Sequence, residues 1–195
     1  PSMLETGLEN LSYNINRRNT NLQFFEFGKT YHTSGIGNYS EQEHIVLYIT
    51  GANHEDQWNE KSQAFSFYTA KGIADALLNL VGLQQIHFEN DATKENPTVQ
   101  ISNHQKVLGV VQQVSSKVLN TFDIKQDVFC IDINYEMLLD EVSKRKISYT
   151  EISKFQPVQR DLAMVVNKNI TYEAIENAVK KTKNNKLQSI RLFDV

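Results

Sequence analysis

The polar stretch Ser143–Gln159, which contains Pro157, divides this sequence into two parts of opposite charge. Residues 1–147 hold 12 Lys and Arg against 18 Asp and Glu, whereas residues 148–195 hold 8 against 5. Pro157 cannot donate a backbone hydrogen bond, and it biases the residue before it toward extended geometry. We therefore predict two units, one over residues 1–147 and a second, basic one over residues 148–195.

The composition supports a packed core and a cytoplasmic protein. Of the 195 residues, 40% are apolar, and no apolar run approaches the ~20 residues that a membrane helix needs. Cys130 is the only cysteine, so no internal disulfide can form, which fits a reducing compartment. Its neighbours Phe129 and Ile131 predict that it packs within a strand. Because the chain begins with Pro1-Ser2 and not with Met, we expect a piece of a longer protein.

The first unit alternates predicted helices and strands. Ser2-Met3-Leu4-Glu5 has the form of a capping box, and Leu4, Leu8, Leu11 and Ile15 follow at helical spacing. Asn21–Gly28 is aromatic on both faces, so we predict a central strand covered on both sides, followed by a loop over Thr33–Ser40. Further helices are predicted over Phe67–Leu83, Ser115–Phe122 and Tyr135–Val142. Gly82 is expected to close the first of these, and Asn134 to cap the start of the last. Further strands are predicted over His44–Gly51, Gln85–Glu89, Thr98–Ser102, Val107–Gln112 and Asp127–Asn134.

The second unit has the predicted order strand, helix, strand. The strands are Asp161–Asn167 and Leu187–Val195, and the helix between them is Thr171–Lys183, capped by Thr171. The pair Arg160-Asp161 stands where the first strand begins. It indicates either a salt bridge that fixes the start of the strand or a contact with a partner.

A basic cluster follows the helix of the second unit, and two interpretations of it stay open. The cations can complement the negative end of the helix, or they can contact phosphates. The aromatic residues by which RNA-recognition modules stack bases are absent from Asp161–Asn167. The cluster comprises Lys180, Lys181, Lys183, Lys186 and Arg191.

Most catalytic and metal-binding patterns are absent. Gly28-Lys29-Thr30 ends like a phosphate-binding loop, but Gln23 occupies the position of the required first glycine. The five histidines are scattered without metal-ligand spacing. Glu26 lies in the aromatic strand, where a carboxylate is more often held by a hydrogen bond or ion pair than used as a base. We predict no catalytic residue and no metal site.

Six short motifs follow one another along nearly the whole chain: Ser2–Leu11 with Tyr13-Asn14, Phe24–Lys29, Thr50-Gly51, Tyr68–Gly72, Ile152–Val166 and Leu192–Val195. No single motif is specific, but their order is. In this order they resemble the β subunit of bacterial phenylalanyl-tRNA synthetases.

The resemblance implies an α+β fold with two modules. Residues 1–147 would form an antiparallel-sheet domain similar to a class II synthetase core but inactive, and residues 148–195 the first half of a ferredoxin-like anticodon-binding domain. The family's editing domain and N-terminal modules would lie upstream. A class II site needs arginines that bind ATP phosphates, yet Asn21–Gly28 has none, and no later arginine follows a glycine-rich run.

The implied partners are a catalytic α subunit, in an α2β2 heterotetramer, and tRNA(Phe). ATP and Mg would bind the whole enzyme on other domains or on the α subunit, and none is expected on this chain. The implied tRNA contacts are Lys180, Lys181, Lys183, Lys186, Arg191 and Arg160. The alternative is a stand-alone α+β protein-interaction module without nucleic-acid binding.

The sequence also departs from the family pattern. The motifs expected near Asn96-Pro97 and at Val111–Ser115 are altered, which leaves their local role open. In a ferredoxin-like fold, the two strands predicted in the second unit are not neighbours, because a third strand lies between them. We therefore expect the last strand to be irregular, swapped or supported by another chain.

Overall fold

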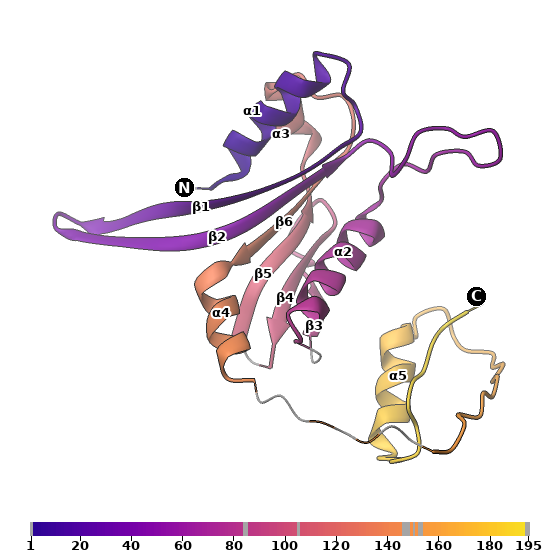
Figure 1. Cartoon of the computed structure of the whole chain (residues 1–195). Helices are drawn as coiled ribbons and strands as arrows, with labels where there is room; N and C mark the ends of the chain where they lie inside the picture. The colour runs from indigo at the N-terminus through magenta and orange to yellow at the C-terminus, as the bar shows by residue number, and fades with distance from the viewer. Residues whose placement is uncertain are drawn as a thin grey trace. The chain divides into compact units, whose positions relative to one another are not determined.

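The computed structural model describes residues 2–83, 86–104, 106–145, 149, 151 and 154–193, and it divides the chain into two compact units (Figure 1). The first is Pro1–Ile147 and the second is Ser148–Val195. Across the described ranges, no helix has the length and apolar character to cross a membrane.

The first unit is built on one antiparallel sheet of six strands in the order β1-β2-β6-β5-β4-β3 (Figure 1). The sheet joins a long hairpin to a three-stranded meander through the central strand β6. The strands are β1 (Leu22–Gly35), β2 (Asn38–Thr50), β3 (Ile86–Asn90), β4 (Thr98–Asn103), β5 (Lys106–Gln113) and β6 (Val128–Asn134).

The position predicted for the aromatic strand was wrong. Asn21–Gly28 belongs to β1, which is an edge strand rather than a central one, and alternate side chains along it are exposed. The loop predicted over Thr33–Ser40 is also wrong, because the hairpin continues to a tight turn at Ile36-Gly37. Aromatic residues on both faces of a strand favour burial because of their residue type. Residue type cannot tell a central strand from an edge strand, and only the order of strands in the sheet does so.

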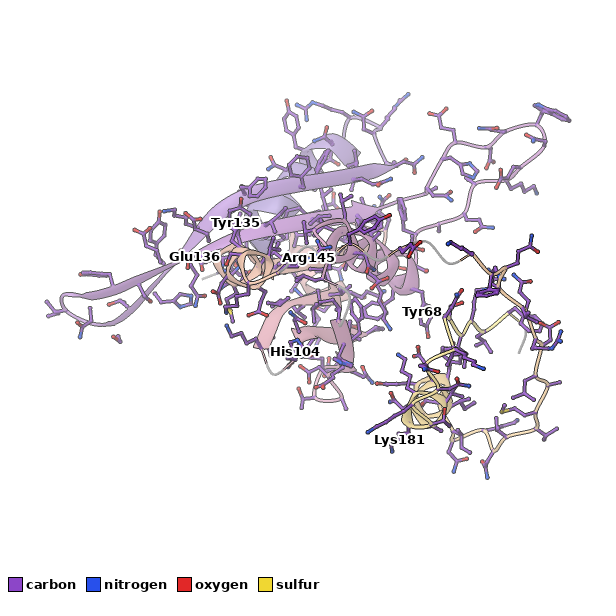
Figure 2. The ribbon with its side chains drawn as sticks, turned by 60° about the horizontal axis from the view of Figure 1, so that its bottom comes forward. Tyr68, His104, Tyr135, Glu136, Arg145 and Lys181 are labelled. Atoms are coloured by element: carbon purple, nitrogen blue, oxygen red, sulfur yellow. The ribbon has the colours of Figure 1, made fainter. Side chains whose placement is uncertain are left out.

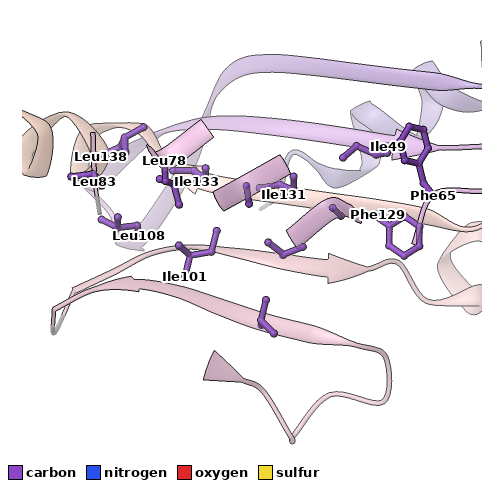
Figure 3. Packing of buried hydrophobic residues seen from close by; sticks show 14 residues of the cluster. Ile49, Phe65, Leu78, Leu83, Ile101, Leu108, Phe129, Ile131, Ile133 and Leu138 are labelled. Carbon is purple, nitrogen blue, oxygen red and sulfur yellow. The ribbon is translucent and has the colours of Figure 1, made fainter. Parts of the chain in front are cut away.

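Two pairs of helices cover opposite faces of the sheet. Helices α1 (Leu4–Ile15) and α3 (Ser116–Thr121) pack over one cluster of buried side chains, and α2 (Phe67–Leu80) and α4 (Tyr135–Ser143) over another. β6 supplies both clusters, as alternation along a strand requires. Phe129, Ile131 and Ile133 enter the α2/α4 cluster (Figure 3), whereas Val128 and Cys130 enter the other. Burial raises the pKa of the Cys130 thiol to about 12, which confirms a packing role.

The helix ends test the predicted caps. Asn134 caps α4 as predicted, since its side-chain oxygen accepts from the Met137 amide at 2.9 Å. The capping box at Ser2 was wrong: the N-cap of α1 is Met3, and the Ser2 hydroxyl accepts from the Leu4 amide at 3.1 Å. Gly82 ends α2 with φ +85°, as the predicted C-cap requires.

The second unit contains α5 (Tyr172–Lys181), capped by Thr171 as predicted. Both predicted strands are wrong over the residues that the structure describes. Asp161–Asn167 and 187–193 form no strand, while residues 194–195 lie outside the description. No described residue from 149 to 193 is buried. A strand needs a neighbour for its backbone hydrogen bonds, whereas a helix satisfies them internally, so only the helix forms. Irregular backbone at 187–193 agrees with one of the three arrangements expected for the last strand, and Asp161–Asn167 is irregular too.

Two helical glycines give a matched test of the packing of α1 on the sheet. A Cβ atom at Gly7 would lie 2.1 Å from the ring of Tyr48, whereas one at Gly72 in α2 would meet no atom within 4 Å. We expect Gly7→Ala to lower the free energy of unfolding by about 1–3 kcal/mol, because the buried ring must shift. Gly72→Ala should raise it by about 0.5–1 kcal/mol through helix propensity alone. Urea denaturation of both variants checks this, and stabilisation by both would contradict the packing described.

Candidate functional site

An aromatic strip runs along one face of the β1–β2 hairpin. We define this hairpin strip as Phe25, Phe27, Tyr31 and Tyr39. Phe25, Phe27 and Tyr31 alternate along β1 and so share a face, and Tyr39 joins it by pairing opposite Thr33. The side chain of Phe25 is 69% exposed and that of Phe27 is 57% exposed. The sequence predicted that Asn21–Gly28 is buried on both faces. The exposure of Phe25 and Phe27 was therefore missed.

The inner end of the hairpin strip is anchored on α4. The ring of Phe27 meets that of Tyr135 edge-on at 5.3 Å, and the ring of Phe25 meets that of Phe27 at 6.1 Å. Figure 2 shows Tyr135 at the start of α4, next to the hairpin. These contacts hold the strip in a fixed arrangement beside the free backbone groups of an edge strand. Such a surface suits docking of another protein, by packing and by strand pairing.

The predicted basic residues occur in the second unit, at and beyond the end of α5. Lys180 and Lys181 occupy its last turn, and Lys181 extends from the helix end (Figure 2). Lys180 pairs with Glu176 at 2.9 Å, one helical turn earlier. Part of its charge is therefore balanced within the helix by an ion pair.

The remaining predicted cations are exposed. Lys183 has the left-handed backbone φ of +51°, which turns the chain after the helix, and Lys186 and Arg191 follow. The Arg160 guanidinium donates to the carbonyl of Gln159 at 3.3 Å, and no ion pair with Asp161 is present between these two described residues. The salt bridge considered for Arg160-Asp161 is therefore not formed.

A hydrogen-bonded relay of three polar side chains crosses β1, β2 and β6. Nδ1 of His44 lies 2.7 Å from the Asp132 carboxylate, and Nε2 lies 3.0 Å from the Thr30 hydroxyl. This order of groups resembles a nucleophile–base–acid triad. However, Thr30 is only 5% exposed, so its hydroxyl is not placed to attack a substrate. We interpret the relay as a cross-strand connection that satisfies three buried or half-buried polar groups.

Along β1 and β2, the described residues offer no arginine that could bind nucleotide phosphates. The shallow cleft between α1 and β1 is lined by Asn10, Asn14 and Glu26. A carboxylate in that position repels phosphate oxygens. In the described part of the chain, no cluster of three or more His, Cys, Asp or Glu could hold a metal.

Comparison with family models decides the relationship. Residues 1–135 match the model described as "Phenylalanyl tRNA synthetase beta chain CLM domain". The chain belongs to this family. Residues 153–195 match a second model, described as "Ferredoxin-fold anticodon binding domain".

Curated relatives match the chain over its whole length. The phenylalanine–tRNA ligase β subunit of Bacteroides thetaiotaomicron is 33% identical over 206 residues, and that of Bacteroides fragilis is 31% identical over 208. The β subunit of Listeria innocua is 30% identical over 199 residues. Each match covers all of this chain and 25% of the relative. The chain thus spans about a quarter of the length of these β subunits.

Two solved structures that resemble the chain are of a pyrrolysyl-tRNA synthetase. The pyrrolysyl-tRNA synthetase of Desulfitobacterium hafniense is similar with a TM-score of 0.56 and 15% identity, over 76% of this chain and 54% of that one. A second structure of the enzyme from this organism gives 0.55 and 18%. At such identity the likeness concerns the fold alone. It confirms an α+β fold with a synthetase-like antiparallel sheet, and the family match confirms the predicted resemblance to the synthetase β chain.

The relay gives a stability test within the synthetase β-chain fold. His44→Ala should lower the free energy of unfolding by about 1–3 kcal/mol, because Asp132 and Thr30 lose their partner inside the sheet. His87, exposed on β3, is the matched control. His87→Ala should change the free energy of unfolding by less than about 0.5 kcal/mol. Chemical denaturation measures both. Equal effects would show that the hydrogen bonds of His44 contribute nothing to the sheet.

Proposed function

We propose that this chain is a non-catalytic part of the β subunit of phenylalanine–tRNA ligase. In this role it scaffolds the catalytic α subunit and contributes to binding of tRNA(Phe) during ATP-dependent charging. One observation carries the proposal: a synthetase-like sheet keeps an exposed aromatic strip on its edge hairpin but has no arginine on β1 or β2. Residues 1–147 would be the catalytic-core-like domain and residues 148–195 the start of the anticodon-binding domain.

The absence of phosphate-binding arginines supports an inactive module. Adenylation needs positive groups that stabilise charge on the transferring phosphate. The one Lys or Arg of β1 and β2 is Lys29, and Glu41 and Glu43 pair with it at 3.1 and 3.3 Å, so its charge is already balanced. ATP and Mg would therefore bind on other domains or on the α subunit. The charging activity belongs to the assembled enzyme, an α2β2 heterotetramer of the cytoplasm.

The basic second unit supports a role toward tRNA. It matches a family model named for anticodon binding, and its excess of Lys and Arg contrasts with the acidic first unit. The cations are Lys180, Lys181, Lys183, Lys186, Arg191 and Arg160. Because all six are exposed, phosphates can reach them. The alternative is a protein-interaction module without nucleic-acid binding, in which these lysines only complement the end of α5.

The hairpin strip should be the main contact with the α subunit. We expect Phe25→Asp to weaken co-purification of the chain with the synthetase α subunit by about 30-fold or more, because an exposed aromatic anchor is replaced by a charge. Affinity pull-down at increasing α-subunit concentration measures the loss.

Tyr68 on α2 supplies the control, since it is an equally exposed aromatic residue outside the hairpin. Tyr68→Asp should leave the affinity for the α subunit unchanged. If the unmodified chain fails to bind the α subunit, the scaffolding role is wrong; if both substitutions weaken binding alike, the hairpin strip has no special part in it.

Binding of tRNA should depend steeply on salt. The triple replacement of Lys180, Lys181 and Lys183 by Ala should weaken tRNA binding without changing which tRNA is preferred, because phosphate contacts carry no sequence information. The slope of log K against log salt should flatten by about 1 for each phosphate contact that is lost. Filter binding from low to moderate salt measures both quantities.

A triple replacement in the acidic first unit is the matched control: Lys94, Lys117 and Lys125 changed to Ala. It alters the net charge equally but should leave the salt slope as it was. Salt-independent binding, or equal losses from the two triple variants, would show that Lys180, Lys181 and Lys183 do not contact phosphates. Failure of the unmodified chain to bind tRNA would favour the alternative without nucleic-acid binding.

A further inference from the structure

The loop between β2 and α2 carries the most exposed aromatic side chain of the first unit. We define the tryptophan loop as residues 52–64. Trp58 is the only tryptophan of the chain, and its side chain is 99% exposed. In Figure 1 the loop leaves the end of β2, extends away from the sheet and returns to α2. It lies on the other side of the sheet region from the turn of the β1–β2 hairpin, so it is separate from the hairpin strip.

The tryptophan loop is built by internal hydrogen bonds and is not an irregular excursion. At its base, Ala52 and Ala64 form an antiparallel bridge, and the Asn53 amide donates to the Gln63 carbonyl at 3.0 Å. At its tip, Gln57 and Glu60 exchange backbone hydrogen bonds of 2.8 and 3.3 Å. Trp58 therefore occupies the two-residue turn of a small hairpin-like projection.

Asp56 fixes the shape of the tip. Its carboxylate accepts from the Ser62 amide at 2.8 Å and from the Ser62 hydroxyl at 2.6 Å. These two hydrogen bonds hold the pKa of the Asp56 carboxyl below its usual range, so the group is ionised at neutral pH. His54 adds a contact, with Nε2 lying 3.6 Å from a Glu60 carboxylate oxygen. The hydrogen bonds and the His54–Glu60 contact that fix this turn therefore do not involve the indole ring of Trp58.

The charge around Trp58 selects the kind of partner. The loop carries Glu55, Asp56 and Glu60 against the single cation Lys61. Acidic groups beside an aromatic ring repel the phosphates of a nucleic acid. The charge of the loop therefore disfavours stacking of a nucleic-acid base on Trp58. They attract Lys and Arg, whose cations also bind the face of an indole. The complementary surface is a protein recess that takes up an indole and is rimmed by basic side chains.

We propose that the tryptophan loop is a second docking element toward the α subunit, in which Trp58 enters an apolar recess rimmed by Lys or Arg. The inference rests on the proposed scaffolding function and names a contact that is separate from the hairpin strip. An aromatic side chain held at the tip of a preformed projection loses little conformational freedom on binding, which is the property of an interface anchor.

Because the chain has one tryptophan, its intrinsic fluorescence reports on this loop alone. The experiment titrates the 195-residue chain with purified synthetase α subunit and follows the tryptophan emission and its quenching by acrylamide, with a tryptophan-free α subunit to keep the signal specific. We expect a blue shift and weaker quenching on binding. Trp58→Ala should weaken binding about 30-fold, and Trp58→Tyr should restore part of the affinity.

A charge pair tests the basic rim. Glu55→Lys removes an acidic group that makes no side-chain hydrogen bond within the described loop, and it should weaken α-subunit binding by about tenfold at low salt. Glu95→Lys, an equal charge reversal in the exposed β3–β4 connection, is the control. It should change the affinity for the α subunit by less than twofold.

The outcomes separate this inference from the proposed function. If the complex forms, the emission of the unmodified chain does not change on binding and Trp58→Ala binds as tightly as the unmodified chain, the docking role of the loop is wrong while scaffolding stands. If tRNA rather than the α subunit shifts the emission, the protein partner is wrong. If the unmodified chain does not bind the α subunit at all, scaffolding fails, and this contact fails with it.

Discussion

The pairing of β6 with both β2 and β5 is the constraint on which the first unit depends. This strand joins the β1–β2 hairpin to the β3–β4–β5 meander, so without it the sheet would separate into two ribbons. Its alternating side chains also feed the two buried clusters under the two helix pairs. Burial of both faces stabilises β6 directly, at roughly 25 cal/mol for each Å² of apolar surface removed from water. The two edge strands, β1 and β3, keep backbone groups without a partner in the sheet.

Local signals in the sequence predicted the elements of this unit well. The helices over Phe67–Leu80 and Tyr135–Ser143 follow from apolar spacing, with a capping asparagine before one and a left-handed glycine after the other. β6 follows from Phe129, Ile131 and Ile133 at every second position around Cys130. Each of these signals acts within a few residues, so it can be recognised in the sequence without knowledge of the rest of the fold. The ranges of the elements and the resemblance to the synthetase family came from such signals.

What the sequence could not give was the order of strands in the sheet. Phe24, Phe25 and Phe27 predict burial by composition, but in β1 only the face of Leu22 and Phe24 belongs to a buried cluster, and Phe25 and Phe27 on the other face are exposed. Strand order is set by long-range pairing, which no short window contains. The hairpin strip was missed for this reason, although Phe25 and Phe27 were in view. Trp58 differs: a lone tryptophan among Glu55, Asp56, Gln57 and Asn59 is a visible anomaly, because a polar loop has no core to hold it.

The second unit shows how much of a fold survives when its strands have no partners. Apolar residues such as Leu162, Met164 and Leu192 keep the pattern of strands, yet they are exposed and form none. α5 persists, because its capping hydrogen bond from Ala174 to Thr171 and its ion pair between Lys180 and Glu176 are both local. These interactions order the helix but bury nothing, so the unit has charge without a core of its own among its described residues. Its exposed cations can therefore contact a polyanion. Recognition of a partner by shape would need a fixed surface, and such a surface forms only once the apolar residues of the unit are covered.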